Sequence, residues 1–256
     1  MRGDLVVSIP VLLGFLLTLV RVSGVFVFVP IPGASSSLGP ARVLLSLGIT
    51  IALFSHWPKV AGTPSVESFV AWIFLEAALG VGTGLAVAFV MEAFGVGAQI
   101  MGLQAGYAFA STVDPNTQAD STVLVVLSQV AAGLLFFAMG LDHQVIQILA
   151  RSLETQPAGS FTLSRGAAEQ MLLMGSTMFS TGLRLAMPMI AILVMLDISL
   201  ALLGRVNSQL QLLHISFPVK MVVALGLLGS LAMMLPTLFR ITAAGTFAAA
   251  RGLIAR

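Results

Sequence analysis

Long runs of apolar residues, separated by short polar or Pro/Gly-rich connectors, dominate the hydrophobic pattern of the chain. A membrane-crossing α-helix needs roughly 20 mainly apolar residues. Six runs reach or approach this length, and we expect each to form a span: 5–29, 42–57, 69–90, 123–149, 171–203 and 210–235. The pattern therefore predicts an all-α, polytopic integral membrane protein built of long helical hairpins.

The composition of the chain agrees with a membrane location. Of 256 residues, 58% are hydrophobic and only 9% are charged, whereas an ordinary soluble domain is about 25% charged. So few charges cannot form the polar shell that a soluble protein of this size needs. Most of the outer surface is therefore expected to face lipid or other hydrophobic protein.

The basic residues predict an orientation and give no sign of nucleic-acid binding. With six spans and both termini in the cytoplasm, the inside segments hold seven Lys and Arg residues and the outside segments two. This bias follows the positive-inside rule. The inside set is Arg2, Lys59, Arg151, Arg165, Arg240, Arg251 and Arg256, and the outside set is Arg42 and Arg205.

Residue patterns typical of enzymes and metal sites are missing from the sequence. There is no cysteine, no His-Glu-x-x-His site, no Gly-x-Ser-x-Gly elbow and no phosphate-binding loop. His56, His143 and His214 are far apart in sequence, and Asp142 and His143 are adjacent, so on a helix their side chains should point apart. We expect no catalytic activity, no cofactor and no metal.

Ionisable residues inside apolar runs are costly, so they usually face a partner or water. Here they either pair with charges on neighbouring helices, contact a neighbouring subunit, or extend to a membrane interface. The candidates for buried ionic contacts or assembly are Arg21, Glu76, Arg184, Asp197, Arg205 and Lys220.

Small residues recur every four positions in two of the apolar stretches. Gly80 and Gly84 form one such series, and Gly102 and Gly106 form another. Such ridges let helix backbones approach closely in a membrane. The spacing predicts close helix packing at these four glycines, but the partner helix can belong to this chain or to another.

The longest polar interruption in the centre of the chain covers residues 107–121. One interpretation is an ordinary connector outside the membrane. The other is a loop folded into a water-filled pore, because non-helical backbone at membrane depth needs a wet or protein-lined surrounding. The candidate residues of such a loop, which would plug the pore, are Tyr107, Phe109, Ser111, Asp114, Pro115, Asn116 and Asp120.

Five motifs in order along the chain resemble those of the FliR family, the R subunits of the flagellar type III export gate. The central motif is Gly-Leu-Gln at 102–104, followed by a small-residue run and by Asp114-Pro115, with Ala105 where the family usually has Met. Ser208 also stands where Pro is usual. The other motifs are Arg21-Val22-Ser23-Gly24 with Pro30, His143 with Pro157-Ala158-Gly159, Leu185-Ala186-Met187-Pro188, and residues 204–210 with Phe217-Pro218.

The resemblance implies a channel-forming, non-enzymatic subunit of the flagellar protein export gate in the bacterial inner membrane, at the flagellar basal body. Its partners would be the P and Q gate subunits, the nearby B and A export-apparatus proteins, unfolded flagellar substrates and membrane lipid. Residues 1–168 would be P-like, with 107–121 as a plug, 169–236 would be a Q-like hairpin, and 237–256 a cytoplasmic tail. The alternatives are a virulence-type (injectisome) gate subunit and a self-sufficient secondary transporter.

Overall fold

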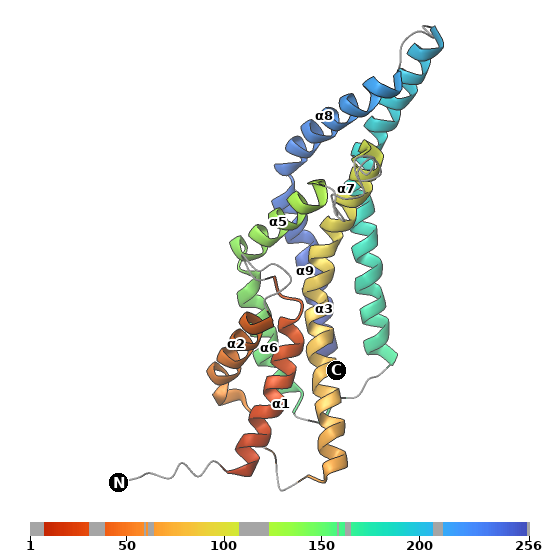
Figure 1. Cartoon of the computed structure of the whole chain (residues 1–256). Coiled ribbons are helices and arrows are strands. Elements are labelled where there is room, and N and C mark those ends of the chain that lie inside the picture. The colour runs from red at the N-terminus through yellow and green to blue at the C-terminus, as the bar shows by residue number, and fades with distance from the viewer. Residues whose placement is uncertain are drawn as a thin grey trace. The chain divides into compact units, whose positions relative to one another are not determined.

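The computed structural model of the chain consists of α-helices joined by connections that Figure 1 traces from the N- to the C-terminus. It describes residues 8–30, 39–58, 60, 64–107, 123–157, 159–161, 165–206 and 212–254, and these contain no strand. The prediction of an all-α fold is confirmed. The elements are α1 (Ile9–Phe26), α2 (Gly39–Ala52), the 3₁₀ turn η1 (Phe54–His56), α3 (Val66–Ala105), α5 (Val123–Ala138), α6 (Leu141–Thr155), α7 (Arg165–Val206), α8 (Leu212–Ala232) and α9 (Leu235–Ile254).

The helices form two compact units, and each unit takes residues from several parts of the chain. Unit 1 comprises Met1–Phe89, Phe136–Met174 and Ala244–Arg256, and unit 2 comprises Val90–Leu135 and Gly175–Ala243. α3, α5, α7 and α9 each contribute residues to both units. The division at residues 168 and 236, which rests on the family resemblance, stays a prediction.

The ends of α3 follow from local capping chemistry. Ser65 precedes the first turn, and its Oγ accepts the backbone N–H of Ser68 at 3.3 Å, which satisfies one of the free donors of a helix start. At the other end Gly106 has a φ of +85°. Its N–H bonds to Leu103 O at 3.1 Å and the Tyr107 N–H bonds to Gly102 O at 3.0 Å. These two bonds are the Schellman arrangement, which ends a helix at a glycine.

The described helices give fewer membrane spans than the hydrophobic pattern predicts. α1, α3 and α7 are long and apolar enough to cross a membrane, and up to five spans result if two bent pairs are each counted as one. α5 and α6 form one pair, bent by 64° at Gly140, and α8 and α9 form the other, bent by 65°. The expected second span becomes α2, whose 14 residues fall short of the length that a bilayer requires.

Breaks within apolar runs have identifiable local causes. Gly140 has a φ of +65°, a left-handed conformation that ends α5 and that glycine adopts without steric cost. Pro236 occupies the first turn of α9, where its missing N–H is tolerated. Gly140 does not interrupt the hydropathy of its run, so hydropathy alone predicts a continuous helix there, whereas Pro236 lies just beyond the apolar run 210–235.

Each unit has its own core. In unit 1, α1 and α3 cross with their backbones in contact, and Leu17, Val22 and Val25 are fully buried. In unit 2, α3, α7 and α8 pack together around Met101, Met189 and Ala224.

Candidate functional sites

A buried arginine in unit 1 joins three separate segments of the chain. Arg21, on α1, is 1% exposed. Its Nε donates to Glu76 Oε2 of α3 at 2.5 Å. One terminal nitrogen donates to the Ser152 carbonyl at 2.6 Å, and the other donates to the Gln156 carbonyl at 2.9 Å. These carbonyls close the C-terminal end of α6, where a helix favours a cation. Arg21 therefore ion-pairs with α3 and caps α6 at the same time.

Glu76 extends this cluster to the turn after α6. Its side chain is also 1% exposed, and its second oxygen accepts the Gly159 N–H at 3.3 Å. Gly159 has a φ of +77°, and a Cβ at this position would overlap the indole of Trp72. The Pro-Ala-Gly motif thus brings a backbone donor to a buried carboxylate, in a conformation that glycine adopts most readily.

The glycines of α3 lie against α1 within unit 1. A Cβ at Gly80 would overlap the carbonyl oxygen of Arg21, and one at Gly84 would lie 2.9 Å from the carbonyl oxygen of Val25. Across the helix pair, a Cβ at Gly24 would lie 2.9 Å from the backbone nitrogen of Val81. The partner of the Gly80 and Gly84 ridge is therefore a helix of this same chain.

The C-terminal end of α3 lies against α8 in unit 2. A Cβ at Gly106 would lie 2.7 Å from a ring carbon of Phe217. The Tyr107 hydroxyl donates to the Met221 carbonyl at 3.1 Å, and burial raises the pKa of this phenol. Gly106 consequently ends α3 and also lies in close contact with Phe217. The polar segment 107–121 begins at Tyr107, which is held to α8 by its hydrogen bond.

Two residues before Gly106, at Gln104, three helices of unit 2 meet at an ion pair. Lys220 of α8 contacts Asp197 of α7 through Nζ and Oδ1, and the Lys220 side chain is 14% exposed. Gln104 of α3 approaches the other carboxylate oxygen, with Nε2 3.4 Å from Oδ2. Because the charges are paired, Lys220 and Asp197 can lie between apolar helices at a lower cost than either would alone.

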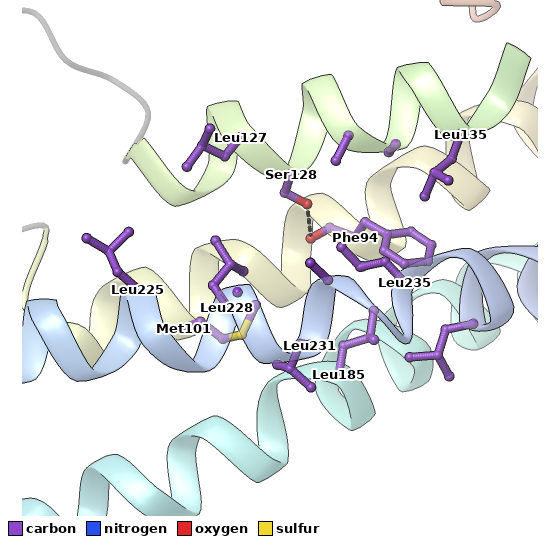
Figure 2. Close-up of a pocket in the computed structure, with 15 residues that line it drawn as sticks. Phe94, Met101, Leu127, Ser128, Leu135, Leu185, Leu225, Leu228, Leu231 and Leu235 are labelled. Carbon is purple, nitrogen blue, oxygen red and sulfur yellow. Dashed lines mark hydrogen bonds between the residues drawn. The ribbon is translucent and has the colours of Figure 1, made fainter. Parts of the chain in front are cut away.

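An apolar cavity of about 350 Å³ lies in unit 2. Figure 2 shows leucines of α5 and α8 on facing sides of it, with Phe94 of α3 between them, and Met101 of α3 also lines it. Ser128 is its polar side chain, and its hydroxyl donates to the Phe94 carbonyl at 3.0 Å. That donor is satisfied, so the cavity presents an almost wholly apolar lining.

The remaining predicted residues are placed as follows. Arg184 and Arg205 are exposed on α7, and Gly102 is buried in α3. Asp142 and His143 do not point apart as expected, because His143 Nδ1 lies 3.1 Å from Asp142 Oδ2. Six of the predicted pore-plug residues lie outside the described residues: Phe109, Ser111, Asp114, Pro115, Asn116 and Asp120.

Some structural contacts have little or no signal in the sequence. The Ser152 and Gln156 groups that bind Arg21 include backbone carbonyls, which no residue pattern reveals. Gly97 and Gly182 form a close crossing of α3 and α7 in unit 2, with a Cβ at Gly182 lying 2.9 Å from the Ala93 carbonyl oxygen. These glycines do not share one four-residue series, so the spacing of small residues gives no signal for them.

Comparison with known proteins places the chain in a family. The profile of the bacterial export proteins, family 1, matches residues 12–244. The chain belongs to this family. Three relatives are named flagellar biosynthetic protein FliR. They come from Escherichia coli K12 (32% identical over 195 residues, 75% of this chain and 74% of the relative), Pectobacterium carotovorum (29% over 197 residues, 76% of each) and Bacillus subtilis (22% over 213 residues, 82% of each).

Membership of the bacterial export proteins confirms the family that the five motifs predicted. Several helices long and apolar enough to cross a membrane agree with a multi-pass membrane component of a flagellar export apparatus. The Arg21 motif falls at the buried ion pair, and the Gly-Leu-Gln motif falls at the capped end of α3.

Proposed function

We propose that the chain is a non-enzymatic, channel-forming subunit of the flagellar type III export gate in the bacterial inner membrane. It assembles with the P and Q gate subunits at the basal body, near the B and A export-apparatus proteins, and passes unfolded flagellar proteins. The match across residues 12–244 and the similarity to FliR proteins support this proposal.

The observation that carries the assembly part is the uncovered surface of α7. Only 17% of its most apolar 18-residue window is buried within the chain. Large side chains along the helix remain exposed, including Leu172 at 74%, Phe179 at 62% and Met195 at 70%. A surface of this size and character needs lipid or another protein against it. A gate subunit that packs between sister subunits satisfies this need.

The polar segment 107–121 is proposed as the plug of the resting gate. It follows directly from Tyr107, whose hydroxyl is bonded to α8, and its Asp, Asn, Ser and Thr residues suit a wet lumen better than lipid. Replacing residues 109–120 by a short Gly-Ser linker should leave assembly intact and make the assembled gate leak small ions. Conductance of the variant complex in planar bilayers checks this, and a gate as tight as the parent contradicts the plug role.

Assembly is tested by tagging the full chain in its native membrane and identifying the proteins that co-purify. We expect P and Q subunits in fixed ratio, and loss of motility when the chain is deleted. A secondary transporter would instead purify as an active assembly of this chain alone. Restoration of injectisome secretion without motility would favour the virulence-type gate, so motility and effector secretion are measured in parallel strains.

A further inference from the structure

A polar pocket in unit 1 is lined by two arginines from helices that are distant in sequence. The pocket has a volume of about 420 Å³ and lies between α6 and the end of α9. Gln144, Gln147 and Arg151 line it from successive turns of one α6 face, and Arg251 enters from α9. All four side chains are exposed.

The two walls of the pocket are fastened to each other. The Ile254 carbonyl at the end of α9 accepts a hydrogen bond from Gln156 Nε2 at 3.2 Å and one from Thr155 Oγ1 at 3.4 Å. Within α9 the Arg251 Nε donates to Phe247 O at 3.3 Å, which leaves its two terminal nitrogens free of that bond. These contacts hold the arginine-bearing turn of α9 against α6.

The acidic residue of the pocket has its own partner. Glu154 also lines the pocket, but its Oε1 lies 3.2 Å from His56 Nε2 of η1. Among the described residues, neither Arg151 nor Arg251 forms an ion pair. The pocket therefore presents two guanidinium groups and two amides against one carboxylate already in contact with His56. This donor set suits an anion with several oxygens, because arginine binds phosphate through paired N–H groups.

The neighbouring surface is typical of a membrane interface. η1 contacts α6, and next to His56 the rings of Phe54 and Trp57 lie 4.9 Å apart. Phe54 is 64% exposed, and the preceding α2 exposes Val43 and Leu44 at 66% and 68%. Trp and other aromatic side chains gather at headgroup level, with aliphatic side chains toward the acyl region. Exposed aliphatic residues, aromatic rings and the arginine pocket thus follow one another within unit 1.

We propose that this pocket binds the phosphate headgroup of an anionic membrane phospholipid through Arg151 and Arg251, with Gln144 and Gln147 as further donors. The lipid tails lie along the exposed aliphatic and aromatic surface of α2 and η1. Anionic lipids of the cytoplasmic leaflet attract basic residues at this level, and the positive-inside distribution predicts that both arginines face the cytoplasm. The site does not depend on the export role of the chain.

The test uses the full chain in phosphatidylcholine nanodiscs that contain photoreactive phosphatidylglycerol or, in parallel, photoreactive phosphatidylcholine. After illumination, labelled peptides are identified by mass spectrometry. We expect the anionic probe to label peptides covering 144–155 and 244–254 in preference to the neutral probe. Each arginine removed should weaken the anionic labelling about five-fold, and Arg151→Gln with Arg251→Gln about thirty-fold.

Control variants separate a built site from general attraction by charge. Arg165→Gln removes one positive charge from an arginine of unit 1 that is 93% exposed and paired with Glu169, and it should leave labelling unchanged. Arg151→Lys with Arg251→Lys keeps the charge but loses the paired N–H groups, so labelling should fall below the parent and stay above the double Gln variant. Gln147→Glu adds a carboxylate at an exposed position of the pocket and should lower labelling even if the double Gln variant fails to fold.

Four results would overturn the proposal. The first is equal labelling by the two probes, and the second is undiminished labelling of both the double Gln variant and Gln147→Glu. The third is a loss of labelling in Arg165→Gln as large as that caused by removing one pocket arginine. The fourth is displacement of the anionic probe by excess inorganic phosphate. The last result would identify a site for a free anion and not for a lipid.

Discussion

Arg21 Nε and Glu76 Oε2 lie 2.5 Å apart in unit 1, and both side chains are 1% exposed. Taking two charges out of water is costly, so such a pair adds little net stability over apolar residues of the same shape. Removing one partner is different, because the other charge is then left buried without compensation. The pair therefore determines that α1 and α3 pack against each other, and it adds little to the free energy of their packing.

We predict that Arg21→Met or Glu76→Gln lowers the free energy of unfolding by about 3–5 kcal/mol. The combined change Arg21→Met with Glu76→Leu should recover much of this loss, because no unpaired charge remains. Denaturant titration in detergent measures both effects, followed by the fluorescence of the two tryptophans, Trp57 and Trp72, which both lie in unit 1. Single variants within about 1 kcal/mol of the parent would contradict the prediction, since losses from a broken buried pair exceed that.

Gly106→Ala should destabilise the chain more than Gly140→Ala. Both glycines have a positive φ, of +85° and +65°, so both substitutions introduce backbone strain of about 1 kcal/mol. A Cβ at Gly140 meets nothing within 4 Å, whereas one at Gly106 meets the Phe217 ring. The difference between the two variants therefore isolates this ring contact, and overpacking adds about 1–3 kcal/mol. Equal unfolding midpoints would show that the ring moves aside freely.

Filling the apolar cavity should stabilise unit 2. Ala131 lines it from α5, and Ala131→Leu adds apolar volume in a space that Figure 2 shows bordered by leucines. We expect a gain of about 1 kcal/mol. Ala131→Ser is the matched control, because it places a hydroxyl in the same space and should destabilise by a similar amount. A loss in both variants would mean that the space is already occupied in the folded protein.

Tyr107 should titrate above the ordinary tyrosine range. Burial raises the pKa of its phenol, so the folded protein holds the proton more tightly than the unfolded chain does. This contribution to stability is complete below a pH of about 10 and is lost as the pH rises from there to the folded pKa. The chain has one tyrosine, so phenolate absorbance reports this residue alone.

The decisive comparison for Tyr107 is between folded and unfolded protein. The titration midpoint should return to about 10 on unfolding. Tyr107→Phe should remove the alkaline loss of stability and cost about 1 kcal/mol at neutral pH, because the hydrogen bond to Met221 O is lost. Identical midpoints in the two states would contradict the prediction.

How far the sequence predicts this structure depends on whether the deciding contact is local. A long apolar run is a local property, so it predicts the spans α1, α3 and α7, and the ordered motifs predict the family. The break at Gly140 was not predicted, because a glycine inside an apolar run is common in membrane helices and its φ leaves no mark on hydropathy. Arg21 and Glu76 were both candidates, yet their pairing joins residues 55 positions apart, and side-chain chemistry alone does not choose among several possible carboxylates.

The capping of α6 by Arg21 also sets a time order for the growing chain. The last partner of Arg21, the Gln156 carbonyl, is synthesised 135 residues after Arg21 itself. At about 5–20 residues per second, the ribosome needs on the order of ten seconds to supply it. Glu76 arrives earlier, 55 residues after Arg21, so α1 can pair with α3 first and receive α6 afterwards. Unit 1 is therefore completed late in synthesis. Until α6 has been made, Arg21 of α1 has only part of its final set of hydrogen bonds.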